Sequence, residues 1–431
     1  MVVPLISDIE QAKRVPTRNG FGAGLAKAGA SNPQVVVLCA DLTESTRAKD
    51  FKDKFPERFI EIGVAEQNLA AVASGLAAVG KIPFVTSYAM FSPGRSWERI
   101  RTTIAYNDRP VKIAGAHAGI SVGPDGATHQ ALEDIGIMRG IPNMIVIAPC
   151  DAMEMEKATM AAAGVAKPVY LRFGREKTPV ITTQDTPFVI GKAEVFREGE
   201  DVAIIACGIM VYESLKAAQE LERTGIQAAV INCHTIKPLD AETILSYAKK
   251  CKSIVTAEEH QVHNGLGSAV AEAVSEQFPV PVVRVGVSDR FGESGTPDEL
   301  LDKFGLRAKD IIAAAIKAMS LGNPEKLFGP VDTQMAQSLL GKTSPQTAFH
   351  LSSGVSTPSI KHLADEIQMM DDAVFSFHVT SEKNDFSNWI CDVFGQERLS
   401  LIVRQVSNPQ DLAILLDRFI HHVNRERSNT P

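Results

Sequence analysis

Tryptophan and tyrosine are scarce in this chain of 431 residues, which holds only two and five of them. It has no run of about 20 apolar residues, and this absence argues against a membrane-spanning helix. The first residues lack the basic region and apolar stretch of a secretory signal. Six cysteines are spread along the sequence without a C-x-x-C pair. We therefore expect a cytoplasmic protein with reduced thiols.

An excess of basic residues is also missing, because 51 Asp and Glu outnumber 44 Lys and Arg and leave a net charge of -7. A whole-protein basic surface for nucleic acid is therefore excluded, although a local basic site is not. Hydrophobic residues at 45% and charged residues at 22% are ordinary for a globular protein. At about 100–200 residues per domain, the length predicts two to four domains.

Short apolar runs alternate with helical patterns over residues 10–182 and again over residues 188–320. Continuous apolar runs of this kind are typical of parallel strands covered on both faces, so we predict two doubly wound α/β domains. Residues 321–359 are rich in Pro, Ser, Thr and Gly and predict a linker. Residues 360–431 contain three helix-like segments and predict a small α-helical domain.

A carboxylate opens an otherwise small and apolar helical segment at residues 62–68, IGVAEQN. Glu66 would favour the positive end of a helix dipole, and for an isolated glutamate that is the simpler interpretation. A buried glutamate with a raised pKa would instead share a proton with a ligand. The sequence leaves both roles open.

Two histidines and an aspartate lie in a glycine-rich loop, HAGISVGPDGATHQ, at residues 117–130. The loop follows a predicted strand, and ligands usually bind at the carboxyl ends of strands in an open α/β sheet. Its spacing is not that of a helical His-x3-His zinc site, so no metal site is predicted. The alternative is a loop whose His and Asp side chains bind their own backbone.

Seven segments stand out along residues 10–320. They are ADLTES (40–45), FPERFIEIGVAEQN (55–68), SYAMFSPGR (87–95), HAGISVGPDGATHQALEDIGIMRGIPNM (117–144), HTIKPLD (234–240), EEHQVHNGLGSAV (258–270) and RFGESGTPDELLDKFGL (290–306). In this order they resemble the C-terminal half of transketolase. The match is closest to the small subunit of the split transketolases, in which two polypeptides make one enzyme.

The resemblance implies thiamine diphosphate as cofactor. Glu66 matches the glutamate that hydrogen-bonds the pyrimidine ring nitrogen and so promotes deprotonation of the thiazolium carbon. Tyr88 and Phe91 match the aromatic wall around the pyrimidine, which Gly94 makes thinner here. Asp41 matches a residue beside the thiazolium and aminopyrimidine.

On the substrate side, the resemblance implies that Asp125 reads the C2 hydroxyl of an aldose acceptor. His129 would lie near the reacting oxygens of the donor. A guanidinium binds phosphate in a bidentate way, which suits a phosphorylated substrate. The residues that match the sugar-phosphate clamp of the family are Arg18, Ser45, His117 and Arg172.

A Gly-Asp-Gly triplet is absent from the sequence. In the family this triplet and a downstream Asn hold the diphosphate and Mg²⁺, so the resemblance implies that a partner subunit supplies them. We expect the chain alone to be inactive and to assemble with that large subunit as an α2β2 tetramer. The family's C-terminal domain, here residues 188–320, is expected mainly to support dimer packing.

Other functions stay open. A deoxyxylulose-phosphate-synthase-like enzyme would share Glu66 and Asp125, and the β subunit of a 2-oxo acid dehydrogenase is a weaker alternative. A non-catalytic regulatory paralogue is the alternative from another class.

The glycines at 265 and 267 would either bind an anion at a helix N-terminus or allow a close-packed turn. The helical domain would serve either as a packing module or as a docking unit.

Overall fold

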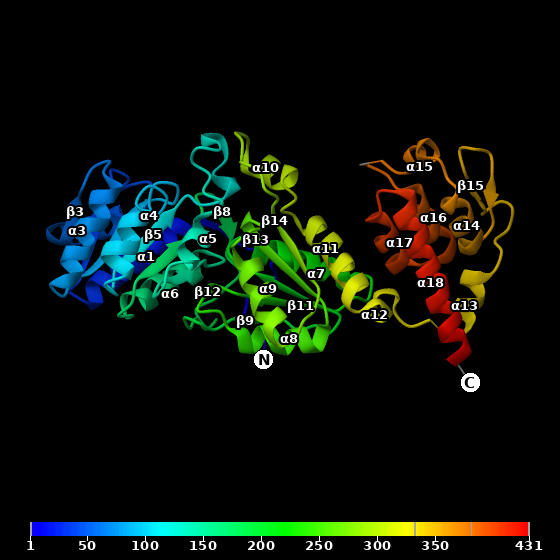
Figure 1. Ribbon diagram of the computed structural model, residues 1–431, viewed down its shortest axis with the longest axis horizontal. Coiled ribbons are helices and arrows are strands. Elements are labelled where there is room, and N and C mark those ends of the chain that lie inside the picture. The colour runs from blue at the N-terminus through cyan, green and yellow to red at the C-terminus, as the bar shows by residue number, and fades with distance from the viewer. Residues whose placement is uncertain (1, 332, 381, 430–431) are drawn as a thin grey trace. The chain divides into compact units, whose positions relative to one another are not determined.

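The structure is a computed structural model that describes residues 2–331, 333–380 and 382–429. The chain divides into two compact units (Figure 1). The first comprises Met1–Gln219 and Gln227–Ala318, and the second comprises Glu220–Ile226 and Met319–Pro431. None of the described helices is long and apolar enough to cross a membrane.

Seven strands form the first sheet of the larger unit, in the order β12-β6-β7-β5-β4-β2-β3. All neighbours are parallel except β12, which runs antiparallel to β6. Since β12 lies late in the sequence, the chain returns to this sheet after it has begun the second one. The strands are β2 (Val35–Cys39), β3 (Phe59–Glu61), β4 (Ile82–Tyr88), β5 (Lys112–Ala116), β6 (Ile145–Ile147), β7 (Val169–Arg172) and β12 (Thr235–Lys237).

Five strands form the second sheet, in the order β14-β13-β10-β11-β9, and only β9 is antiparallel to its neighbour. The predicted pair of α/β sheet domains is therefore confirmed. The strands are β9 (Glu194–Arg197), β10 (Val202–Ala206), β11 (Ala228–Asn232), β13 (Ile254–Gln261) and β14 (Val282–Val287). The accompanying helices are α7 (Met210–Arg223), α8 (Ala241–Cys251), α9 (Leu266–Gln277), α10 (Pro297–Lys303) and α11 (Ala308–Gly322).

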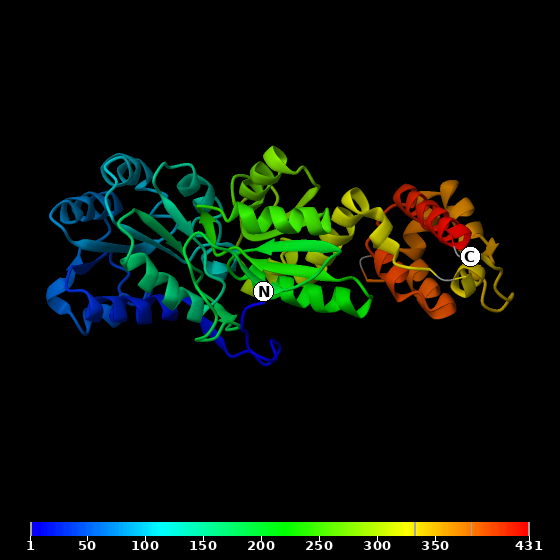
Figure 2. The same cartoon turned by 90° about the horizontal axis from the view of Figure 1, so that it is seen from below.

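Helices cover both faces of the first sheet, as two views at right angles show (Figures 1 and 2). A Cβ atom on Gly20 would lie 1.9 Å from the carbonyl oxygen of Ala152, so glycine lets α1 pack directly on α6. This contact fixes the start of α1, where Arg18 lies. The elements are β1 (Arg14–Pro16), β8 (Lys177–Pro179), α1 (Thr17–Ser31), α2 (Lys49–Lys52), η1 (Pro56–Arg58), α3 (Glu66–Ala78), α4 (Trp97–Arg99), η2 (Ile100–Ala105), η3 (Ile120–Asp125), α5 (Asp134–Arg139) and α6 (Ala152–Ala163).

A buried carboxylate links elements of the two sheets. The Glu154 side chain accepts a hydrogen bond from the Cys150 backbone N–H and another from the Asn232 amide, each at 2.6 Å. Burial, with the nearby Asp151 charge, raises the pKa of Glu154 to about 7. The amide oxygen of Asn232 has no hydrogen-bond partner among the described residues.

Replacement of Glu154 by glutamine should remove the loss of folding stability that this buried carboxyl group causes as pH rises. In the native state the Glu154 carboxyl group keeps its proton up to about pH 7. In an unfolded chain a glutamate loses its proton at about pH 4.5. Wild-type stability therefore falls as pH rises through that window, by about 3 kcal/mol. The introduced glutamine side chain would accept from Cys150 and donate to a flipped Asn232. We expect the stability difference between E154Q and wild type to grow from pH 4.5 to 8 in denaturant titrations.

The Glu276→Gln variant on α9 is the control, because it also removes one carboxylate but from an exposed position. It should follow the wild-type pH dependence. If the stabilities of E154Q and wild type changed in parallel from pH 4.5 to 8, Glu154 would be ionised in the native state over that whole range.

The smaller unit begins earlier than the sequence indicates. Residues 321–359, expected to form a linker, instead contain two helices and the β15–β16 hairpin, and α13 packs against α14 and α18. The Trp389 indole N–H donates to the Thr347 carbonyl at 2.8 Å, which ties this segment to the helices. The elements are α12 (Pro324–Phe328), α13 (Thr333–Leu340), β15 (Phe349–His350), β16 (Ser356–Thr357), α14 (Ile360–Gln368), α15 (Asp372–His378), α16 (Asp385–Phe394), α17 (Glu397–Arg404) and α18 (Pro409–Asn429).

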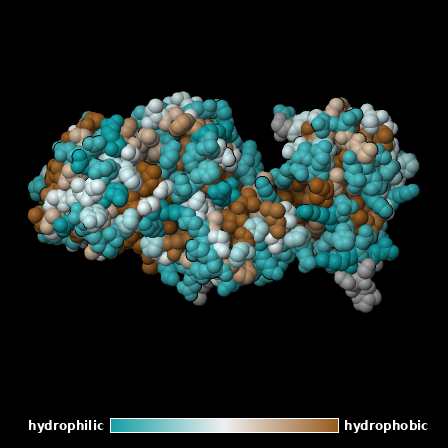
Figure 3. All heavy atoms as spheres, viewed as in Figure 1, coloured by the Kyte–Doolittle hydropathy of each residue, from teal (hydrophilic) through white to brown (hydrophobic). Residues whose placement is uncertain are grey.

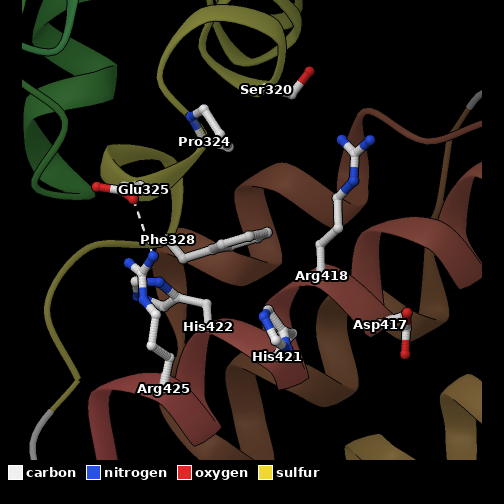
Figure 4. Close-up of a pocket in the computed structure, with 9 residues that line it drawn as sticks. All are labelled: Ser320, Pro324, Glu325, Phe328, Asp417, Arg418, His421, His422 and Arg425. Atoms are coloured by element: carbon white, nitrogen blue, oxygen red, sulfur yellow. Dashed lines mark hydrogen bonds and ion pairs between the residues drawn. The ribbon is translucent and has the colours of Figure 1, made fainter. Parts of the chain in front are cut away.

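An open pocket of about 490 Å³ lies in this unit, between α12 and α18 (Figure 4). The Phe328 ring lies across it, and the Arg425 guanidinium pairs with Glu325 at 3.0 Å. Arg418 and His421 project from α18, as Arg425 does. The mixed charges of this lining do not select one class of ligand.

Candidate active site

Glu66 is the first residue of α3, where the helix dipole favours a carboxylate. Its side chain is 3% exposed. One carboxylate oxygen accepts a hydrogen bond from Arg95 at 3.0 Å, and the Arg95 guanidinium lies 5.2 Å from the centre of the Phe91 ring. For the other oxygen, the described residues provide no hydrogen bond. The buried carboxyl group therefore has one oxygen available to a ligand.

Aromatic rings gather beside this carboxylate at the carboxyl ends of β4 and β5. Tyr88, the last residue of β4, stacks on His117 with ring centres 4.0 Å apart. Phe91 lies parallel to Tyr88 at 6.1 Å and meets His129 edge-on at 5.3 Å. Because β4 and β5 are parallel neighbours, their ends bring residues 88–91 and 117–129 together. The structure thus unites four of the predicted site residues in one cluster.

The loop after β2 is held by Glu61, to which the sequence assigns no role. The Glu61 carboxylate accepts hydrogen bonds from the backbone N–H groups of Asp41 and Gly63 at 2.8 and 3.0 Å, and from the Thr43 hydroxyl at 3.1 Å. Asp41 itself is exposed and has a left-handed backbone with φ of 57°. Glu61 therefore joins the Asp41 loop to the turn that precedes Glu66.

Arg18 and Arg175 lie next to His117, and Arg47 lies near Arg18; we call these three arginines the cationic group. Burial lowers the pKa of Arg18, and the charges of Arg175 and Arg47 lower it further. Burial also lowers the pKa of His117 to about 3, with Arg18 and Arg175 contributing, so the imidazole is neutral near pH 7.

Two buried polar atoms of this region have no partner among the described residues, Nε of Arg18 and Nδ1 of His117. Arg18 also donates to the backbone carbonyl of Ser45 at 3.1 Å, which places the Ser45 segment beside the guanidinium. An anion would accept the unsatisfied buried Arg18 N–H and would be stabilised by the neighbouring positive charges.

Arg172 does not join the cationic group. It is 6% exposed, pairs with Asp134 at 2.8 Å, and donates to the Glu259 carbonyl at 2.8 Å. Burial alone would lower the pKa of Arg172, but the Asp134 carboxylate raises it above the usual value. The prediction of a phosphate contact for Arg172 therefore needs correction, because its guanidinium is occupied inside the protein.

Arg175, three residues later, has the exposure and the neighbours expected of Arg172. Its guanidinium donates to the Val122 carbonyl at 3.0 Å and pairs with Asp125 at 3.4 Å, with its side chain 32% exposed. Asp125 thus lies beside the cationic group. The signal in the sequence was the second arginine of RFGRE, residues 172–176.

His129 is partly exposed, and its Nδ1 lies 3.0 Å from the Thr128 hydroxyl. The next residue, Gln130, is buried and donates to the carbonyls of Ile120 and Glu293 at 3.1 and 2.9 Å. His129 therefore projects from a well-anchored point of the loop.

The turn at Gly265 and Gly267 already holds an anion from the chain itself. The buried Glu258 carboxylate accepts hydrogen bonds from the backbone N–H groups of Leu266 and Gly267, both at 2.7 Å. His260 accepts from the Gly136 N–H at 3.3 Å. The start of α9 is therefore closed to an external anion.

The site fits a nitrogen heterocycle held by Glu66 against Tyr88 and Phe91, as thiamine diphosphate would require. Among the described residues, no group of three or more His, Cys, Asp and Glu side chains is placed to hold a metal ion.

Comparisons with known proteins agree with this geometry. Residues 13–180 match the family model of the transketolase pyrimidine-binding domain, and residues 191–311 match that of the transketolase C-terminal domain. A protein of Methanocaldococcus jannaschii, provisionally described as a transketolase C-terminal section, is 45% identical over 70% of this chain and 96% of its own. A 6-deoxy-6-sulfo-D-fructose transketolase subunit of Clostridium sp. is also 45% identical, over 65% of this chain and 88% of its own.

A solved structure of a split-gene transketolase, an inactive β4 tetramer, is 48% identical and superposes with a TM-score of 0.68. The match covers 72% of this chain and all of that one. Glu66 and the loop of residues 117–130 lie inside the part of the chain that matches the pyrimidine-binding domain. The chain belongs to the transketolase family, whose pyrimidine-binding and C-terminal domains it carries.

Proposed function

We propose that this chain is the smaller subunit of a two-chain, thiamine diphosphate-dependent transketolase, which transfers a two-carbon ketol unit between a ketose phosphate and an aldose phosphate. The observation that carries the proposal is the convergence of a buried carboxylate, an aromatic cluster and a cationic group at the carboxyl ends of one sheet. Each part serves a different portion of such a reaction.

Glu66 binds the pyrimidine ring nitrogen through its available oxygen, while Tyr88 and Phe91 pack against the ring and Asp41 lies at its edge. When bound, the cofactor supplies the carbon nucleophile that breaks and forms the sugar carbon–carbon bond. The chain's own contribution at this end is a proton held at the Glu66 carboxyl group.

The sugar is bound at the other end of the site. Asp125 accepts a hydrogen bond from a substrate hydroxyl, and His129 exchanges a proton with the reacting oxygens. The phosphate meets Arg18, Ser45 and His117. We assign the remaining phosphate contact to Arg175, because Arg172 is occupied by Asp134.

The missing half of the site belongs to a partner, and α3 presents a surface for one. Val64 and Val79 flank this helix and are 70% and 74% exposed. Ala71 and Gly75 between them are also exposed, and a Cβ atom added to Gly75 would meet no atom within 4 Å. Apolar residues reach the surface at this end of the sheet domains (Figure 3). We propose that the N-terminal subunit, which carries Gly-Asp-Gly and supplies Mg²⁺, packs here in an α2β2 tetramer.

The test is reconstitution with the transketolase N-terminal subunit from the same genome. We expect no ketol transfer by the chain alone and transfer by the mixture when thiamine diphosphate and Mg²⁺ are present. The inactive β4 tetramer of the similar split-gene protein supports this expectation. Gly75→Glu should prevent both assembly, measured by light scattering, and activity. Gln410→Glu, at an exposed position on α18, should change neither.

Full ketol transfer by the chain alone would refute the proposal. Consumption of pyruvate with release of CO₂ would instead identify a deoxyxylulose-phosphate-synthase-like enzyme. A panel of ketose donors should include 6-deoxy-6-sulfofructose and apulose 4-phosphate, since the names of two relatives contain these sugars. No turnover with any donor, despite assembly, would favour the regulatory paralogue.

A further inference from the structure

The loop at residues 117–130, which we call the substrate loop, carries three of the proposed site residues. Its backbone is left-handed at Gly119, Gly123 and Gly126, with φ of 94°, 80° and 75°. The only regular structure within it is the short turn of η3. Such a loop needs contacts from outside to keep one shape.

One outside contact comes from the second sheet. Glu259, on β13, is 3% exposed, and its carboxylate accepts a hydrogen bond from the Ser121 backbone N–H at 2.6 Å. The same carboxylate packs against Gly119, where a Cβ atom would lie 2.3–2.5 Å from its atoms. Glycine is therefore required at 119 by the space that Glu259 occupies as well as by the backbone angle.

Glu259 is itself rigidly held. Its carbonyl accepts from Arg172 at 2.8 Å, Arg172 pairs with Asp134, and the Tyr170 hydroxyl donates to Asp134 at 2.6 Å. These side chains are all buried. The network thus connects the last residue of β7 in the first sheet to β13 in the second.

The other end of the loop is fixed in the same way. The Gln130 amide donates to the carbonyls of Ile120 and Gly123 inside the loop, at 3.1 and 3.3 Å. It also donates at 2.9 Å to the carbonyl of Glu293, which belongs to the segment after the second sheet. The C-terminal domain therefore contacts the loop at both ends.

We propose that Glu259 is a positioning residue of the active site: through Ser121 and Gly119 it holds the substrate loop in the shape that presents Asp125 and His129 to the sugar. The inference rests on the proposed function. It gives the C-terminal domain a role in substrate binding, beyond the support of dimer packing that the resemblance implies. A carboxyl oxygen that accepts a hydrogen bond from a buried N–H is a directional restraint on the loop.

The first test needs no activity. Amide hydrogen exchange of residues 117–130 is measured in wild type, Glu259→Ala, Glu259→Gln and Glu259→Asp. We expect exchange in the loop to rise about tenfold or more in the alanine variant, because the Ser121 N–H loses its acceptor. Glutamine retains an acceptor oxygen at the same reach and should restore protection. Aspartate keeps the charge but is too short, so its loop should exchange as in the alanine variant.

The second test uses the reconstituted complex. Glu259→Ala and Glu259→Asp should raise KM for the sugar phosphates about tenfold or more, with the affinity for thiamine diphosphate unchanged, while Glu259→Gln stays near wild type. Loop exchange unchanged in both Ala and Asp variants would overturn the inference. An inactive wild-type complex would refute the proposed function alone, because the exchange measurement still decides the role of Glu259. If the alanine variant does not fold, the aspartate variant decides both readouts.

Discussion

Glu66→Gln is expected to lower kcat of the reconstituted enzyme by about 10²–10⁴-fold, the range typical of a lost proton-transfer group. Glutamine keeps the volume of the side chain and an oxygen that accepts from Arg95, so the surroundings of the site are preserved. It lacks the carboxyl group that holds a proton at the pyrimidine nitrogen. The loss should therefore appear in kcat, measured by ketol transfer under saturating cofactor and sugar phosphates.

Three controls separate chemistry from assembly. Glu66→Gln should assemble with the partner like wild type in light scattering and should melt within a degree or two of it, because no buried charge is left unpaired: Arg95 is 53% exposed. The exposed Glu276→Gln variant should retain full activity. Turnover of Glu66→Gln equal to that of wild type would mean that the site is misassigned or that the chain is a non-catalytic paralogue.

The strands were readable from the sequence because parallel strands buried on both faces are continuous apolar runs. The run at residues 34–40 became β2, all five residues of which are buried. β12 was not predicted as a strand, because a three-residue TIK segment has no periodicity to read and its place in the first sheet depends on tertiary contacts. The segment 321–359 was expected to be a linker because its composition favours turns, yet α13 gains its stability by packing on α14 and α18.

Some residues of the candidate site can be predicted from the sequence, and the roles of others depend on the fold. Sequence motifs mark Glu66, Tyr88 and His117 as candidates. In the structure Tyr88 stacks on His117, and Glu66 binds Arg95, which lies over the Phe91 ring.

Glu61 and Glu259 also lie in matching segments, but the sequence assigns them no role, because their hydrogen bonds go to the backbone of Asp41 and Ser121, which are distant in sequence. No local pattern marks such a contact. The choice between two arginines three residues apart likewise depends on which one the fold buries.

Replacement of Arg172 by methionine should lower folding stability, whereas replacement of Arg175 should weaken binding of the phosphorylated sugar. Arg172→Met leaves the Asp134 carboxylate, 1% exposed, without its cation, and loss of one partner of a buried pair costs about 3–5 kcal/mol. We expect a large drop in the denaturant midpoint of the isolated chain. Asp134→Leu combined with Arg172→Met should recover part of it, because no unpaired charge then remains.

Arg175→Met should leave stability nearly unchanged, since its partner Asp125 is 34% exposed and exposed pairs contribute about 0–1 kcal/mol. The KM for a phosphorylated sugar should rise about 10–100-fold, as expected for the loss of a hydrogen bond to a charged group. The KM for the same sugar without its phosphate should not change, which is the matched comparison. If instead Arg172→Met selectively raised the KM for the phosphorylated sugar while the midpoint stayed at the wild-type value, the phosphate contact would belong to Arg172. The ion pair with Asp134 would then have to open when substrate binds.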